Sequence, residues 1–372
     1  MKLVNCRIGD YIDPFNQACN NPNLTPWDVS GVNREKEFFE PSRQVGSDTS
    51  KYKIVPPGYF ACNLMHVGRD KVLPIALNHS SKEKYVSPAY TVFSIIDESV
   101  LLKEFFFIYL KSDEKDRYFW FQTDSSIRDG MSWDDFCDVE IQIPEIDIQK
   151  KYVKVYKSMD SNQKCYERGL DDLKLTCDAY IEELRRNYQC EEIRDYICET
   201  NERNNENLFG VEDVQGVNST SEFVETKTDT TGLDFHNYKV IHLDEFAYNP
   251  SRINLGSIAV RRGGDCIVSP MYVSFRVNDT NKLLPQYLMM WYERKEFQRS
   301  TFFYASGSVR DTFGFDVMQE VKIPIPSMDI QRNIVDIYNT YIKRKSINAQ
   351  LKERINRMCS VLIKGAIEEA SV

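Results

Sequence analysis

IQIPEIDIQ, residues 141–149, returns 182 residues further along the chain as IPIPSMDIQ, residues 323–331. In both places a proline marks the end of an extended segment, because proline disfavours a helical conformation in the residue before it. An aspartate then stands where it favours the positive N-terminus of a helix, Asp147 in the first stretch and Asp329 in the second. Each stretch therefore predicts the start of a long helix.

The same offset of 182 residues relates the sequence around these stretches. The matches are YVSPAYTVF (85–93) with IVSPMYVSF (267–275), SIRD (126–129) with SVRD (308–311), Tyr156 with Tyr338, and Cys177 with Cys359. Over about ninety residues the register needs no gap, so chance similarity is a poor explanation. Further upstream the match continues with small shifts, as in GVN (31–33) with GVN (216–218). The chain is an internal duplication, which fixes its architecture.

Each copy consists of a mixed segment followed by a long helical segment. Short alternating runs such as YVSFRV (272–277) predict short strands. In the second helical segment, the residues of one face recur at alternating steps of four and three from Ile330 to Gly365, which is a heptad seam. The first helical segment keeps these steps with a one-residue shift. At about 1.5 Å per residue, Asp329 to Ala370 gives a rod roughly 60 Å long.

These features predict a mixed α/β (α+β) fold. It consists of two duplicated domains joined by two long antiparallel coiled-coil-like helices, with pseudo-twofold symmetry. The predicted boundaries are a first domain at 1–144, a first helix at 145–203, a second domain at 204–326 and a second helix at 327–372. Both seams turn polar near their middle, at Asn162 and at Arg344 and Asn348. Such residues either fix the register of paired helices or mark a solvated break.

Composition limits the class of protein. With 372 residues, 42% of them hydrophobic, the chain can fill two modest cores. Ten scattered cysteines without CxxC pairs indicate reduced thiols. Because the sequence has neither a leader nor an apolar run of membrane-spanning length, we expect a cytoplasmic protein without membrane association.

The formal net charge of −9 argues against a protein that coats DNA non-specifically, since such affinity comes from neutralising phosphates. The four predicted segments carry −5, −3, −4 and +3, so the last alone is basic. Positive surface must be local or must be supplied by a partner.

The motifs of common enzyme sites are missing from the sequence, namely GxxxxGK(S/T), GxGxxG, HExxH and paired CxxC. NPSR (249–252) lacks the second proline and the aromatic residue of an adenine-methyltransferase site. We expect a chain that is not an enzyme and that itself binds neither a cofactor nor a metal. The alternative is a divergent nuclease with carboxylates among Asp134, Asp135, Asp138 and Glu140.

The repeated motifs together resemble the specificity subunits of Type I restriction-modification systems, in which two target-recognition domains alternate with two helical regions. The resemblance covers nearly the whole chain. It is carried by the two stretches quoted first, by Gly307-Ser308-Val309-Arg310 and by the Val-Ser-Pro-x-Tyr strands. The first copy departs from the pattern with Ser125-Ser126 in place of Gly-Ser, and with Gln-Ile-Pro in place of Pro-Ile-Pro. These departures affect a loop of the first domain and leave the architecture intact.

The resemblance implies that each domain reads one half of a split, asymmetric DNA target and that the helices set the length of the unspecified spacer. It also implies partners: modification subunits that dock on the helices and methylate adenine with S-adenosylmethionine, and a restriction/translocase subunit that uses ATP and magnesium. Two further interpretations stay open. One is a related system whose methylation and cleavage share one partner chain, and the other is a coiled-coil assembly protein whose domains bind protein. The target bases, the spacer length and the stoichiometry do not follow from the sequence.

Both copies contain a serine and an arginine at matching positions, Ser126 and Arg128 in the first and Ser308 and Arg310 in the second. A guanidinium beside a hydroxyl suits a phosphate or a base edge. Alternatively, each arginine pairs with the aspartate that follows it and braces the fold. Residues that read different half-sites should differ between the copies, so unshared loops are better candidates for specificity.

The unshared candidates for DNA contact are Arg34, Lys36, Arg43, Arg69 and Lys71 in the first domain and Lys227, Arg252, Arg261 and Arg262 in the second. Each is either a DNA contact or a solvated surface charge. Arg261-Arg262-Gly263-Gly264 is the strongest candidate, since two guanidinium groups before flexible glycines can enter a groove or hold adjacent phosphates.

Overall fold

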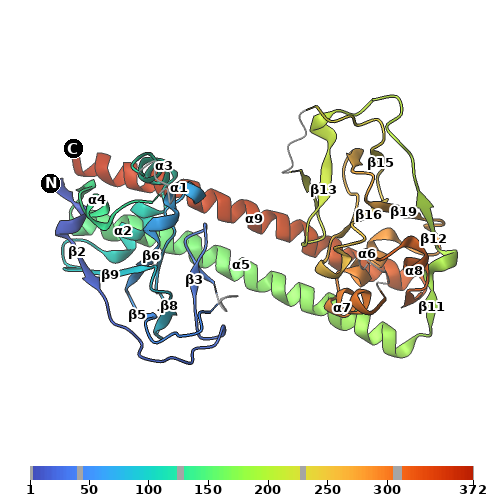
Figure 1. Cartoon of the computed structure of the whole chain (residues 1–372), viewed down its shortest axis with the longest axis horizontal. Helices are drawn as coiled ribbons and strands as arrows, with labels where there is room; N and C mark the ends of the chain where they lie inside the picture. Colours follow the sequence, from blue (N-terminus) through green and yellow to red (C-terminus); the bar gives the residue numbers. More distant parts are fainter. Residues whose placement is uncertain (1–2, 40–44, 124–129, 227–231, 305–311, 372) are drawn as a thin grey trace. The chain divides into compact units, whose positions relative to one another are not determined.

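The computed structural model describes residues 3–39, 45–123, 130–226, 232–304 and 312–371. The chain divides into two compact units (Figure 1). The first unit comprises residues 1–166 and 347–372, and the second comprises residues 167–346. Among the described residues, no helix combines the length and the apolar character that a membrane span requires.

The first unit is built around a four-stranded antiparallel sheet of order β2-β9-β6-β7. Three two-stranded ladders, β1-β10, β3-β4 and β5-β8, accompany it. The strands are β1 (Val4–Arg7), β2 (Ile12–Phe15), β3 (Gly31–Val32), β4 (Phe38–Phe39), β5 (Lys53–Val55), β6 (Phe60–Cys62), β7 (Ile75–Leu77), β8 (Lys84–Val86), β9 (Thr91–Ile95) and β10 (Glu140–Ile143). The helices are η1 (Ile8–Asp10), η2 (Leu64–His66), α1 (Val67–Asp70), α2 (Lys103–Leu110), α3 (Asp113–Phe121), α4 (Trp133–Cys137), the first half of α5 (Ile146–Asn187) and the last part of α9 (Met328–Ser371).

The second unit repeats this plan with a sheet of order β12-β19-β16-β17 and the ladders β11-β20, β13-β14 and β15-β18. Its strands are β11 (Cys190–Glu192), β12 (Ile197–Thr200), β13 (Gln215–Val217), β14 (Phe223–Glu225), β15 (Lys239–Ile241), β16 (Phe246–Tyr248), β17 (Ile258–Val260), β18 (Cys266–Val268), β19 (Val273–Val277) and β20 (Lys322–Pro324). Its helices are the second half of α5, η3 (Ile193–Asp195), η4 (Val211–Asp213), η5 (Ile253–Leu255), α6 (Pro285–Tyr292), α7 (Lys295–Tyr304), α8 (Phe315–Gln319) and the first part of α9 (Met328–Ser371). The predicted mixed fold with two copies of one domain is confirmed.

The repeated stretch that predicted the helix starts makes the same hydrogen bonds in each copy. Its final glutamine is fully buried, and the side-chain amide makes three hydrogen bonds. The Leu102 N–H donates to Gln149 Oε1 at 2.9 Å, while Nε2 donates to the carbonyls of Val100 and Pro144 at 2.8 Å. Gln331 makes the equivalent bonds with the Leu284 N–H and the carbonyls of Lys282 and Pro326, all at 2.9 Å. The glutamine thus fastens the first turn of each long helix to the segment that enters α2 or α6.

The Val-Ser-Pro-x-Tyr motif is explained by the same kind of repeated contact. The Val32 N–H donates to the Tyr90 hydroxyl at 3.0 Å, and the Val217 N–H donates to the Tyr272 hydroxyl at 3.1 Å. Paired phenylalanines stack at the centre of each sheet, with ring centroids 5.0 Å apart in the first unit and 4.7 Å apart in the second. These shared bonds and stacks form the common scaffold of the two units.

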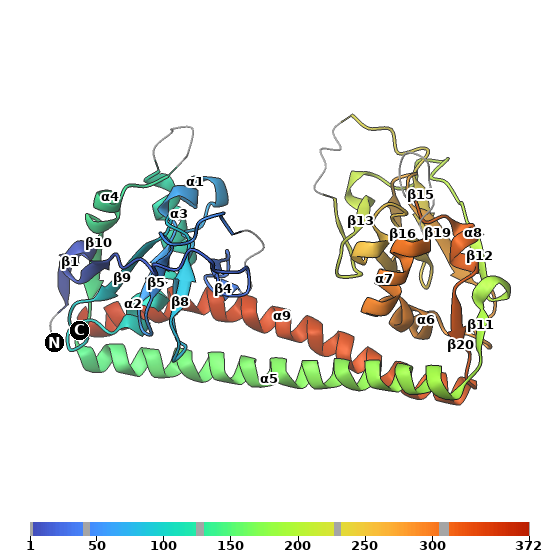
Figure 2. The same cartoon turned by 60° about the horizontal axis from the view of Figure 1, so that its bottom comes forward.

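Within the first unit, residues 146–166 of α5 and residues 347–371 of α9 lie antiparallel (Figure 2). Lys151, near the start of α5, pairs with Glu369, near the end of α9, at 2.6 Å. Farther along, Gln163 Nε2 donates to Asn348 Oδ1 at 2.9 Å. Asn348 is buried, but Asn162 is exposed and its neighbour Gln163 takes the buried position. The predicted polar interruption therefore lies at Gln163 and Asn348.

The predicted first helix is too long at its C-terminal end. α5 ends at Asn187, whereas the sequence prediction extended it to residue 203. Residues 190–200 instead form β11 and β12, which pair with β20 and β19 of the second unit. The strand β11 of the second unit corresponds to β1 of the first unit. In each copy this first strand pairs with the strand that immediately precedes a long helix, β10 before α5 and β20 before α9.

Candidate nucleic-acid interface

In the first unit, three of the predicted residues lie around the short helix α1. Arg34 Nη2 contacts Asp70 Oδ1 at 3.2 Å, and the Arg34 side chain is 66% exposed. Arg69 belongs to α1, although its side chain lies outside what the structure describes. The Lys71 ammonium lies over the Trp120 ring, 4.7 Å from its centroid. We call Arg34, α1, Lys71 and Trp120 the α1 face.

The α1 face combines positive charge with exposed aromatic surface. Trp120 is 42% exposed and the adjacent Phe121 is 84% exposed. Both residues stand at the end of α3, which contacts α1. Guanidinium and ammonium groups contact phosphates, and aromatic rings offer apolar contact to bases and sugars. Such a surface is suited to nucleic acid.

Lys36 is not a surface charge, and the expectation that it contacts DNA is wrong. Its side chain is 3% exposed, and Nζ pairs with Asp116 Oδ1 at 2.7 Å and donates to the Leu110 carbonyl. Burial lowers the pKa of Lys36, and the charge of Asp116 opposes that shift. The same Asp116 oxygen accepts the Leu73 N–H at 2.9 Å. Lys36 therefore ties the turn that carries Arg34 to α3 and to the chain just beyond Lys71.

The second unit closes the equivalent turn by another contact. Ser221 takes the place of Lys36, and both residues have left-handed backbones, with φ of 61° and 63°. The Ser221 hydroxyl donates to the Gly256 carbonyl at 3.1 Å. Gly256, at φ 88°, ends η5, and a Cβ there would meet the Ser219 carbonyl at 2.7 Å. Position 256 therefore requires glycine.

The surface around η5 differs from the α1 face in length and charge. Nine residues connect β16 to β17, whereas twelve connect β6 to β7. Arg252 is exposed immediately before η5, and Leu255 is 60% exposed within it. η5 contacts α7, where Phe302 is 66% exposed. We call Arg252, η5 and Phe302 the η5 face.

Arg261 and Arg262, the strongest pair by sequence, both have partners inside the second unit. Arg261 Nε donates to the Gly264 carbonyl at 2.6 Å, and Nη1 donates to Gln215 Oε1 at 2.7 Å. Arg262 Nη1 donates to Asn339 Oδ1 at 3.3 Å, and its guanidinium lies over the Tyr338 ring. Arg261 therefore contacts β13, and Arg262, which is exposed, contacts α9; that the two guanidinium groups contact DNA stays a prediction.

The remaining candidates, Arg43, Ser126, Arg128, Lys227, Ser308 and Arg310, lie outside the described residues. The described residues that follow the shared serine and arginine are placed alike in the two units. The Met131 N–H donates to the Leu64 carbonyl beside α1, and the Phe313 N–H donates to the Pro250 carbonyl beside η5, both at 3.0 Å. The chain therefore leaves each shared segment next to the α1 face or the η5 face.

A charged contact of the second unit gave no signal in the sequence. His242 lies between two carboxylates, with Nε2 3.1 Å from Glu202 and Nδ1 3.0 Å from Asp265. Partial burial lowers the pKa of His242, but hydrogen bonds to both carboxylates outweigh it and the net shift is upward. Glu202 and Asp265 are 40 and 23 residues away along the chain, so no local spacing indicated the contact.

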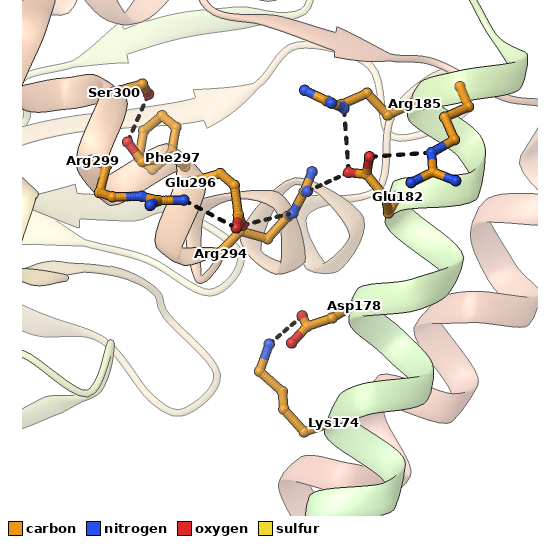
Figure 3. Close-up of polar contacts among 10 residues, drawn as sticks. Lys174, Asp178, Glu182, Arg185, Arg294, Glu296, Phe297, Arg299 and Ser300 are labelled. Carbon is orange, nitrogen blue, oxygen red and sulfur yellow. Dashed lines mark hydrogen bonds and ion pairs between the residues drawn. The ribbon is translucent and has the colours of Figure 1, made fainter.

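A second network fastens α5 to the junction of α6 and α7 (Figure 3). Arg294 is 7% exposed, contacts Glu182 of α5 at 2.7 Å and lies over the Trp291 ring. Glu296 contacts Arg294 from the other side, at 3.7 Å. The first unit has Ser112 at the place of Arg294, so this brace belongs to the second unit.

Two of the four carboxylates of the nuclease alternative, Asp135 and Asp138, have structural partners. Asp135 forms a capping box with Ser132 at the start of α4, and Asp138 pairs with Arg7 at 3.0 Å. Within the ranges that the structure describes, no group of three or more His, Cys, Asp or Glu side chains is placed to hold a metal ion.

A protein-family model matches part of the chain, mostly within the second copy. Residues 199–357 match the family model for the Type I restriction modification DNA specificity domain. The sequence register relates this segment to the first copy. No curated protein matches the sequence.

Three solved structures are similar over 98% of this chain. The Type-I restriction-modification system S subunit from M. genitalium has a TM-score of 0.54, 10% identity and 96% of its own length covered. The HsdS subunit from Thermoanaerobacter tengcongensis has a TM-score of 0.36, 13% identity and 96% covered. A chain from a structure of type I R-M complex assembly and conformational transition has a TM-score of 0.47, 12% identity and 97% covered. Of the three, the M. genitalium subunit has a TM-score above 0.5, and at 10% identity it supports the fold.

Proposed function

We propose that the chain belongs to the family of Type I restriction-modification specificity proteins, that it reads a bipartite, asymmetric DNA target and that it directs partner subunits to this target. The family consists of DNA-recognition subunits that are not themselves catalytic. In our proposal, modification subunits methylate adenine with S-adenosylmethionine, and a restriction subunit supplies cleavage with ATP and magnesium. The complex would act in the cytoplasm.

One observation carries the proposal of two unlike half-sites. The scaffold bonds of Gln149 and Gln331, and those of Tyr90 and Tyr272, are the same in the two units. The surfaces that stand on this scaffold differ in loop length, charge and aromatic content. A protein that read the same bases twice would need the same surface twice, because sequence is read by specific side chains at base edges.

The charge of the chain supports a division of labour with its partners. The formal net charge is −9, and phosphate neutralisation dominates affinity for DNA. We propose that the α1 face and the η5 face supply discrimination, while basic surface of the modification subunits supplies much of the affinity. The isolated chain should then bind its target weakly, with binding that strengthens when the partner is added.

The long helices offer surface for that partner. In the first unit, Val155 of α5 is 44% exposed and Val361 of α9 is 58% exposed. In the second unit, Leu175 is 69% exposed and lines a groove with Tyr180, Asn333 and Ile337. Exposed apolar side chains on long helices can serve as docking surfaces for a partner helix. We propose that the modification subunit binds here.

The test is to map methylated adenines in DNA from cells that carry this chain and its modification partner. We expect methylation within a split motif whose two halves differ and are separated by a fixed number of unspecified base pairs. Exchanging residues 63–74 for the connection 249–257 of the other unit should alter the first half of the motif and leave the second half intact. A continuous motif, or two identical halves, would contradict the proposal.

A further inference from the structure

The polar interruption of the helix pair in the first unit is a contact between two buried amides. The side chains of Gln163 and Asn348 belong to residues 5% and 7% exposed, and Gln163 Nε2 donates to Asn348 Oδ1 at 2.9 Å. The two residues are 185 positions apart in sequence and come from different helices. A buried amide must be hydrogen-bonded, so this contact is specific in a way that an apolar contact is not.

The apolar seam is weak where this contact occurs. From Lys157 to Tyr166 of α5, Gln163 is the buried residue, and from Ile347 to Arg354 of α9 it is Asn348. Deeper in the first unit the same helices contribute Tyr156, Cys359 and Leu362 to the domain core. The amide pair therefore lies beyond the part of the seam that the domain core supports.

We infer that Gln163 and Asn348 form a clasp that keeps α5 and α9 paired where the apolar seam lapses, and that this clasp makes the chain selective for one spacer length. The second half of the inference rests on the proposed function. Two helices that separate at this point would form a flexible connection, and a flexible connection tolerates several distances between half-sites. A buried polar contact also favours one alignment of the helices, because a slip of one helix along the other breaks the hydrogen bond between the two buried amides.

The first arm of the test needs no DNA. Hydrogen exchange of peptides covering residues 157–166 and 347–354 is measured in the full chain and in the double variant Q163A/N348A. We expect exchange at least ten-fold faster in the double variant. The variant Q163L/N348L, which restores contact with an apolar pair, should exchange nearly as slowly as the native chain. Asn162→Ala is the matched control, because it removes an exposed amide one residue away and should change nothing.

Exchange in the double alanine variant that is as slow as in the native chain would overturn the clasp. Exchange that is equally fast in the leucine pair and the alanine pair would also overturn the clasp, because a restored side-chain contact at positions 163 and 348 would then not keep the two helices paired. The single variant Asn348→Ala repeats the measurement with the smallest change, and it should exchange faster in both peptides.

The second arm uses the chain assembled with its modification partner on DNA whose spacer varies in length. The native complex should methylate one spacer length, and the alanine pair should lose at least five-fold of that selectivity while both half-site sequences stay the same. Unchanged selectivity together with faster exchange would overturn the second half of the inference. A native complex that reads no bipartite target would refute the proposed function and leave the result of the first arm standing.

Discussion

Replacing Lys36 by methionine tests whether a buried ion pair holds the α1 face together. The substitution removes one partner of a pair whose side chains are 3% and 13% exposed, and it leaves the Asp116 carboxylate buried. Removing one partner of a buried pair costs about 3–5 kcal/mol, because the remaining charge is no longer compensated. The first unit contains about 190 residues. At about 2–4 °C per kcal/mol for a domain of that size, its midpoint of thermal unfolding should fall by roughly 6–20 °C.

The assay is thermal unfolding of the full chain by calorimetry, which separates the transition of the first unit from that of the second. The double variant K36M/D116N should recover more than half of the loss, because the introduced amide carries no charge and its oxygen still accepts the Leu73 N–H. Lys51→Met is the control, since Lys51 is exposed and an exposed lysine should contribute less than about 0.5 kcal/mol. A loss below about 1 kcal/mol for Lys36→Met, or no recovery in the double variant, would refute the buried pair.

Three further predictions concern the scaffold, the His242 contact and the thiols. Gln149→Leu and Gln331→Leu should each destabilise their own unit by about 2–4 kcal/mol, because each substitution removes three buried hydrogen bonds. In calorimetry each variant should lower the unfolding temperature of its own unit, and a variant that lowered both unfolding temperatures would contradict this prediction. His242 has a raised pKa in the folded chain, so its contribution to stability is fully present below the unfolded value of about 6.5 and is lost as the pH rises through the raised value. The second unit of His242→Gln should therefore lose less stability between pH 6 and pH 8 than the native unit, and equal slopes would refute the contact. Burial raises the pKa of Cys62 to about 12 and that of Cys359 to about 11, whereas Cys165 is exposed. Iodoacetamide at pH 8 should therefore label Cys165 first, and labelling of Cys62 at the same rate would be incompatible with the fold.

The helix starts and the duplication were predictable because their causes are local in the sequence. A proline, an aspartate and a glutamine within nine residues specify the end of a strand, the helix N-terminus and the amide that fastens it. Because of the duplication, this pattern of residues occurs twice in the chain, which makes a chance occurrence a poor explanation. The likeness IGDYI (8–12) with IRDYI (193–197) was also available, and it would have shown that the second unit begins near residue 190 and that α5 ends before it.

The candidate site was less predictable because the state of a charge depends on distant partners. Lys36 stands in a polar turn and looks like a solvated lysine, yet its partner Asp116 is 80 residues away. Arg261 and Arg262 precede two glycines, yet Gln215 and Asn339 hold their guanidinium groups. The sequence pointed to Arg34, Arg69 and Lys71, which the structure places around α1, and their contact with DNA stays a prediction. It gave no means of telling a brace from a contact surface.

The first unit is discontinuous, and this has a consequence for how the chain folds. Its core includes Leu362, Ala366 and Ala370 of α9, whereas the second unit is drawn from the unbroken segment 167–346. During synthesis, all residues of the second unit leave the ribosome before the first unit has its last helix. Until the end of α9 packs against it, the first unit therefore exposes part of its apolar core, which can bind chaperones or lead to aggregation. Slowing translation over residues 347–371 should lengthen that wait and lower the yield of native protein.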